Sequence, residues 1–189
     1  MIFTQENEYS AVLDACVLVP AALCDCLLRL AEEPAVYRPF WSEYILSEMA
    51  NAMERKLNRS AKETLHKRQE MSKAFPDAMV AVPESLVRSL VGIPDEGDRP
   101  VLAAAIMAHA DVIVTQNTKH FPREYLEEYG ILCHTADDFL IHQYHLCGQL
   151  VLDKIDDQAA GISRARAFVI QSLRNAAPGF AKLMDAHTF

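Results

Sequence analysis

The chain alternates short, continuously apolar segments with longer segments of helical periodicity, and this alternation restricts its fold more than any other feature. The segment Val112-Ile113-Val114 is apolar at every position, which is typical of a strand covered on both faces of a sheet. Similar segments predict strands at 11–13, 36–41, 78–82, 111–115 and 131–133. Strands that alternate with helices in this way indicate an α/β fold with a mainly parallel sheet.

Helix signals fill the intervals between these strands. Ser42 is suited to cap a helix after the second strand, and Ser60 with Glu63 forms a capping box for the next helix. Toward the C-terminus the strand signals stop and only helical ones remain. We therefore expect an α/β domain over 1–147 and a C-terminal helical extension over 148–189.

The composition excludes several classes of protein. Hydrophobic residues make up 51% of the 189 residues, enough for a substantial core, and charged residues make up 23%. No apolar run reaches the roughly 18–20 residues that a membrane-spanning helix needs, and the N-terminus lacks the basic start of a signal peptide. The five cysteines are an odd number, which argues against a disulfide framework and favours reduced thiols. We expect a cytoplasmic protein with no membrane segment.

The formal charge of −8 argues at first against a nucleic-acid partner, because proteins that bind nucleic acids usually present a basic surface. Carboxylates that hold metal ions, however, count as negative in the sequence and are neutralised once the ion is bound. The basic residues are also concentrated, since segment 55–73 holds seven arginines and lysines against two glutamates. This segment is either a solvated helix face or an RNA-docking surface, whose binding should weaken as salt rises.

Polar residues stand at or near the ends of several predicted strands. In open α/β sheets, ligands bind outside the carboxyl ends of the strands. Asp14 ends the first strand, and Thr115 and Asn117 follow the strand Val112–Val114. Two further candidates are Glu48, on the helix after the second strand, and Asp98, just before a helix. Oxygen ligands drawn from these positions suit a hard divalent cation such as Mg²⁺.

Four segments follow one another within about residues 9–140 and contain all five of these candidates. They are 10–20 (SAVLDACVLVP), 41–48 (WSEYILSE), 98–105 (DRPVLAAA) and 111–122 (DVIVTQNTKHFP). Each is weakly specific alone, but in this order and in this strand and helix context they resemble the motifs of the PIN-domain family. The resemblance implies a three-layer α/β/α fold, and it is strongest to VapC-like toxins of toxin–antitoxin pairs.

The same resemblance implies metal-dependent cleavage of RNA phosphodiester bonds, with Mg²⁺ or Mn²⁺ as cofactor. Asp14, Glu48 and Asp98 would be the catalytic acids that bind the metal. Thr115 and Asn117 would position water or phosphate at the fourth corner of the site. The implied partners are an RNA substrate and an antitoxin that inserts a basic or amphipathic segment into the acidic cleft. The C-terminal helices would support a homodimer or hold that antitoxin.

The chain departs from the family pattern in the fourth motif, where His120 replaces an aspartate found in many relatives. Asn117 is also neutral, so this corner lacks a carboxylate. The change would weaken a second metal site, slow the enzyme, or favour Mn²⁺ over Mg²⁺ because imidazole is a softer ligand. Asp95, three residues before Asp98, is the candidate to compensate.

Two other functions stay open at this point. A PIN-type scaffold with a weakened fourth corner would bind RNA or a protein without cutting it. A phosphatase of the haloacid-dehalogenase type would use Asp14 as nucleophile, but it needs a second aspartate where this chain has Cys16. The candidates also have plainer interpretations: Asp14 as a turn cap, Glu48 as a solvated helix residue, Asp98 as an N-cap and His120 as an ordinary histidine.

Overall fold

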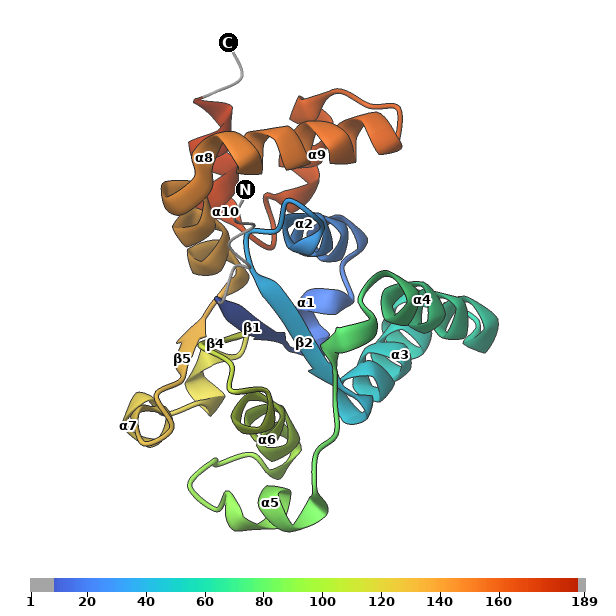
Figure 1. The fold of residues 1–189 in the computed structure, drawn as a ribbon. Coiled ribbons are helices and arrows are strands. Elements are labelled where there is room, and N and C mark those ends of the chain that lie inside the picture. The colour runs from blue at the N-terminus through green and yellow to red at the C-terminus, as the bar shows by residue number, and fades with distance from the viewer. Residues whose placement is uncertain (1–8, 187–189) are drawn as a thin grey trace, which may run out of the picture.

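The computed structural model describes residues 9–186, which fold around a five-stranded sheet (Figure 1). The strands are β1 (Ser10–Leu13), β2 (Arg38–Ser42), β3 (Met79–Val80), β4 (Val112–Val114) and β5 (Leu132–His134). Their order across the sheet is β3-β2-β1-β4-β5, and every neighbouring pair is parallel. The predicted α/β fold with a parallel central sheet is therefore confirmed.

The central strand, β1, is buried along its whole length, as is its neighbour β4. Leu13 of β1 pairs with Val114 of β4, and the Asp14 N–H donates a hydrogen bond to the Val114 carbonyl oxygen at 3.1 Å. Because the two strands run in the same direction, Asp14 and Thr115 leave the sheet at the same edge. The register of this one strand pair therefore brings together two residues that are distant in the sequence.

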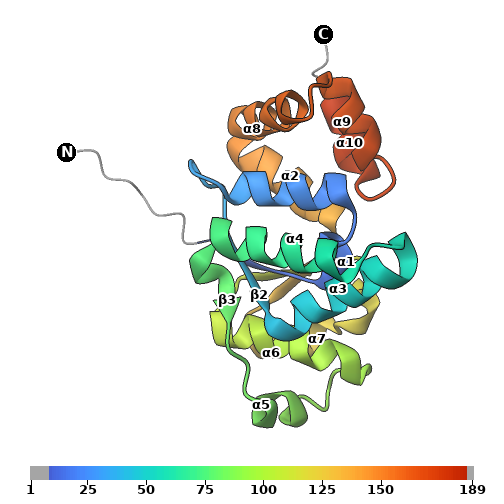
Figure 2. The ribbon, with the colours of Figure 1, turned by 90° about the vertical axis from the view of Figure 1, so that its right-hand side faces the viewer.

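Helices cover both faces of the sheet, which gives the three layers expected (Figures 1 and 2). On one face, α6 (Arg99–Ala108) packs against β1, β2 and β4. On the other face lie α2 (Ala21–Ala31), which contacts β2, and α8 (Ala136–Gly161), which contacts β5. The remaining helices are α1 (Ala15–Leu18), α3 (Glu43–Leu57), α4 (Ala61–Ala74), α5 (Glu84–Ser89), α7 (Arg123–Glu127), α9 (Arg166–Leu173) and α10 (Pro178–Asp185).

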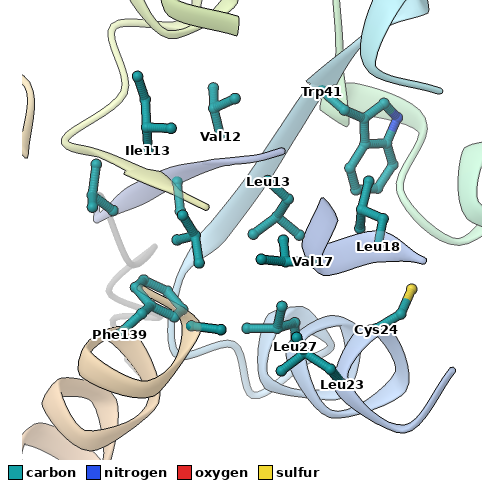
Figure 3. Packing of buried hydrophobic residues seen from close by; sticks show 14 of the residues in the cluster. Val12, Leu13, Val17, Leu18, Leu23, Cys24, Leu27, Trp41, Ile113 and Phe139 are labelled. Atoms are coloured by element: carbon teal, nitrogen blue, oxygen red, sulfur yellow. The ribbon is translucent and has the colours of Figure 1, made fainter. Parts of the chain in front are cut away.

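The core follows from the alternation of side chains across the sheet. In Figure 3, Val12 and Ile113 lie on one side of the sheet, whereas Leu13 points to the other side, toward Leu27 of α2 and Phe139 of α8. All five side chains are fully buried. A short strand that is apolar at every position can be stable here because both of its faces are covered.

The predicted helix caps are present. The Ser42 hydroxyl accepts a hydrogen bond from the Ile45 N–H at the start of α3. Ser60 and Glu63 form the reciprocal bonds of a capping box at the start of α4. Helix α3 follows the carboxyl end of β2 and contributes one wall of the site described below, and α4 packs against α3 (Figure 1).

Three local predictions differ from the structure. The turn of helix α1, directly after β1, was not predicted. The second strand begins at Arg38 instead of residue 36, because the Val36 N–H donates to the Leu30 carbonyl at the end of α2. The third strand has two residues instead of the five expected over 78–82.

Helices α8 and α9 pack on α2, on the same side of the sheet, and α10 packs on α8 and α9. Lys154 of α8 donates to the backbone carbonyls of Glu32 and Glu33, at 2.9 and 3.3 Å. The predicted boundary between residues 147 and 148 falls inside α8, at Cys147, whose backbone torsions are not helical. The division into a domain and an extension stays a prediction. Within residues 9–186, no helix has both the length and the apolar character required to cross a lipid bilayer.

Candidate functional site

Asp14 is a nearly buried carboxylate at the carboxyl end of β1, with 7% of its surface exposed. Its Oδ2 atom accepts a hydrogen bond from the Thr115 hydroxyl at 2.6 Å and another from the Cys16 thiol at 3.0 Å. Thr115 is fully buried, and its hydroxyl oxygen also accepts from the Asn117 N–H at 3.1 Å. The Asp14 side chain makes no capping bond to α1. The Asp14 carboxylate is therefore oriented by the buried Thr115 hydroxyl, and it does not act as a turn cap.

Asp98 precedes α6, yet its side chain makes no capping hydrogen bond to that helix. Its Oδ2 atom instead lies 2.7 Å from Nδ1 of His120, which comes from the turn after β4. Burial raises the pKa of Asp98, while the hydrogen bond and charge of His120 lower it. The carboxylates of Asp95 and Asp14 raise the pKa further. Asp98 thus takes part in one electrostatic cluster with these three residues.

Glu48 is half-buried on α3 and accepts a hydrogen bond from the side-chain amide of Asn51 at 3.2 Å. Tyr44 lies one turn earlier on the same helix, and burial raises its pKa. Four carboxylates raise the Tyr44 pKa further; in decreasing order of effect they are Glu48, Asp98, Asp95 and Asp14. All four acids therefore lie close enough to affect the Tyr44 phenol, although they come from three separate segments of the chain.

These acids line a cleft of about 480 Å³ at the carboxyl edge of the sheet. The predicted site residues on its wall are Asp14, Glu48, Asp95, Asp98, Asn117 and His120. The seventh, Thr115, is buried behind Asp14. The three segments that carry Asp14, Glu48 and Asp98 thus converge as the sequence interpretation requires. Their roles as metal ligands stay a prediction.

The tightest group of potential metal ligands in residues 9–186 is Asp95, Asp98 and His120. Each offers one ligand atom, and these atoms lie within 4.8 Å of one another. Carboxylate oxygens suit Mg²⁺ and Mn²⁺, and the imidazole nitrogen adds a softer donor. The donor set of the cleft therefore fits a divalent cation. This group shares Asp98 with the predicted ligand set of Asp14, Glu48 and Asp98, and it adds Asp95 and His120, which were predicted as supporting residues.

Sequence reasoning did not place four further residues on the wall of the cleft. Tyr44 stands four residues before Glu48, and this helical spacing could have placed it on the same face. Cys16 lies two residues after Asp14, and the thiol contact that links them had no signal in the sequence. Arg55 and Lys56 belong to the basic segment, but their position on the wall of an acidic cleft depends on the direction of α3.

Together, the fold and the cleft define an α/β domain whose parallel strands end at an acidic site suited to a divalent cation. The family model of the PIN domain matches residues 10–119, which is more than half of the chain. The chain belongs to the PIN-domain family.

A curated relative resembles a shorter stretch. It is described as "Putative ribonuclease VapC50" of Mycobacterium tuberculosis and is 53% identical over 49 residues. The match covers 26% of this chain and 29% of that protein. The chain therefore matches less than a third of the length of this relative, and the similarity is local.

Proposed function

We propose that this chain is a divalent-metal-dependent endoribonuclease that hydrolyses RNA phosphodiester bonds. The observation that carries the proposal is the convergence of Asp14, Glu48 and Asp98 in one cleft, from segments far apart in the sequence. Membership in the PIN-domain family and local similarity to a protein described as a ribonuclease support the same activity.

In this proposal, Asp14, Glu48 and Asp98 hold Mg²⁺ or Mn²⁺. A bound divalent cation supplies a Lewis acid, which offsets the charge that builds on the phosphate and lowers the pKa of a bound water. Thr115 orients the Asp14 carboxylate through its 2.6 Å hydrogen bond. Partners of this kind fix a ligand in the geometry that a metal requires. Asn117 lines the cleft and positions the phosphate or a water molecule.

His120 and Asp95 give this chain its own fourth corner. The aspartate expected there is replaced by an imidazole that contacts Asp98, and Asp95 adds a carboxylate to the same group. We infer that the site accepts Mn²⁺ more readily than Mg²⁺, because imidazole is the softer ligand. The ratio of cleavage rates in the two metals tests this inference, and His120→Asp should shift the ratio toward Mg²⁺.

The biological role follows from the same assignment. We propose that the protein is the toxin of a toxin–antitoxin pair, acts on RNA in the cytoplasm and is held inactive by an antitoxin. The C-terminal helices, over 148–189 in the predicted division, would support a homodimer or hold that antitoxin. Co-expression with the neighbouring open reading frame, followed by size-exclusion chromatography, tests this role. A monomer with no co-eluting partner contradicts it.

The enzymatic proposal is tested by cleavage of single-stranded RNA in Mg²⁺, in Mn²⁺ and in EDTA. We expect cleavage in either metal, none in EDTA, and loss of cleavage in Asp14→Asn, Glu48→Gln and Asp98→Asn. Glu84→Gln is the matched control, because Glu84 is an exposed glutamate paired with Arg88 outside the cleft. Each variant is accepted only if its melting temperature shows that it folds.

The neutral Asn117 and the imidazole of His120 also favour a second candidate, a PIN scaffold that binds RNA without cutting it. The same experiment separates the two. RNA binding that persists while cleavage is absent in every metal supports the scaffold. Cleavage that EDTA abolishes excludes it.

A further inference from the structure

Helix α3 forms one wall of the acidic cleft over most of its length. Its cleft-lining residues include Tyr44, Glu48, Ala52, Arg55 and Lys56, whose spacing places them on one helical face. The wall changes its charge along this face, from Glu48 to the two basic residues. At a rise of about 1.5 Å per residue, Arg55 and Lys56 lie about 10–12 Å beyond Glu48 along the helix axis.

None of the other five basic residues of segment 55–73 lines the cleft. Arg59 pairs with Glu63 at 2.8 Å, Arg68 pairs with Glu43, and Lys67 donates to the Leu18 carbonyl at 2.6 Å. Their charges are directed to the protein itself. The remaining two lysines, on α4, are exposed and lie outside the cleft.

Arg55 and Lys56 are, by contrast, exposed cations without an acidic partner within residues 9–186. The Lys56 side chain makes no hydrogen bond among these residues, and the Arg55 side chain makes one, from Nε to the Asn51 backbone carbonyl at 3.3 Å. The terminal guanidinium nitrogens of Arg55 remain available for a ligand. Two unpaired cations at one end of an acidic cleft are suited to a ligand with several negative charges, one of which lies at the metal-binding acids and another at Arg55 and Lys56.

We propose that Arg55 and Lys56 form a phosphate-binding subsite, which holds a flanking phosphate of an RNA strand whose scissile phosphate lies at the acids. This subsite rests on the proposed ribonuclease function and adds to it the direction of the strand along α3. Arg55 can bind a phosphate with two parallel hydrogen bonds, and Lys56 acts as a point charge. In this proposal both residues contact RNA phosphates and not bases, so the subsite positions the RNA strand without reading its sequence.

A plainer role must be separated from this one. Basic residues in the last turn of a helix stabilise it through the helix dipole, and Arg55 and Lys56 stand in the last turn of α3. That role predicts a lower melting temperature for a charge-removing variant and no specific effect on RNA. The subsite predicts a change in RNA binding that a matched loss of charge elsewhere does not reproduce.

The test compares Arg55→Gln/Lys56→Gln with Lys62→Gln/Lys73→Gln, which removes the same charge from exposed positions on α4. Binding of a fluorescent single-stranded RNA is measured by anisotropy in EDTA across a range of NaCl concentrations. For the first variant we expect a several-fold rise in Kd and a salt slope reduced by about 0.7 to 1.4, which corresponds to one or two lost phosphate contacts. The control variant should keep the wild-type slope to within about half a contact.

A second readout uses cleavage in Mn²⁺, where the first variant should raise KM and leave kcat unchanged. Equal effects of the two double variants, or a wild-type protein that does not bind RNA, would overturn the subsite. Because RNA binding is measured in EDTA, where no metal-dependent cleavage occurs, failure of the subsite and failure of the nuclease proposal are separate results. A protein that binds through Arg55 and Lys56 but never cleaves keeps the subsite and refutes the nuclease.

Discussion

The hydroxyl of Thr115 offers the sharpest test of how the site is built. Thr115→Val keeps the volume and the branched shape of the side chain and removes only the hydroxyl. The variant therefore opens no cavity, but Asp14 loses its 2.6 Å donor, and the Asn117 N–H loses an acceptor that water can replace because Asn117 is exposed.

The magnitude follows from the charge and the burial of the bond. A hydrogen bond to a charged group contributes about 1.5–3 kcal/mol. Asp14 keeps its second donor, the Cys16 thiol, so we expect the lower half of that range, about 1.5–2 kcal/mol. For a chain of this size, 1 kcal/mol shifts the melting temperature by about 2–4 °C, so the variant should melt about 3–8 °C lower.

The same change should weaken the proposed metal site. Loss of a residue that orients a metal ligand typically lowers affinity or activity by about 10–100-fold. The assay is thermal unfolding in EDTA followed by RNA cleavage across a Mn²⁺ titration, with Thr115→Ser as the control that keeps the hydroxyl. The reasoning is refuted if Thr115→Val melts and cleaves like the wild type, or if Thr115→Ser falls as far.

Three further changes test other parts of the fold. Gly179→Ala places a Cβ 2.8 Å from an Asp137 carboxylate oxygen that accepts the Gly179 N–H, so we expect about 1–3 kcal/mol lost in urea denaturation; an unchanged midpoint contradicts this. Ser60→Ala removes half of the capping box with Glu63 and should cost about 1 kcal/mol by the same measurement, whereas a neutral result means that α4 forms without its cap. Burial lowers the pKa of His134. As the pH falls through about 6.5, the unfolded chain therefore binds more protons than the folded one, and the contribution of His134 to stability decreases. His134→Gln should flatten the decline in stability that sets in as the pH falls through the ordinary histidine pKa of about 6.5, and an equally steep decline refutes the assignment.

Several elements could be predicted from residues that are close together in the chain. The caps at Ser42 and Ser60 were predictable because each involves a side chain and a backbone group three residues apart. The strand Val112–Val114 was predictable because apolar residues at every position indicate burial on both faces. The parallel sheet followed from the alternation of strands and helices.

Other features depended on contacts between distant residues and could not be predicted. The bond between Thr115 and Asp14 joins residues 101 positions apart, and that between His120 and Asp98 joins residues 22 apart. Sequence reasoning gave both pairs to one site through the family resemblance, but it could not say which side chains touch. Burial of the Asp14 side chain and the thiol contact of Cys16 had no local signal at all.

The sequence by itself determined the types of residue available, which are four acids, one imidazole and a basic helix end, and it specified most of the strands and helices that carry them. The tertiary structure decided their distances and their partners. The physical reason is that a strand register and a helix direction are set by packing across the whole sheet, where hydrophobic burial outweighs local preference. These two choices turned α3 into a wall that carries Glu48 and Lys56 on one side of the cleft, and they put His120 beside Asp98.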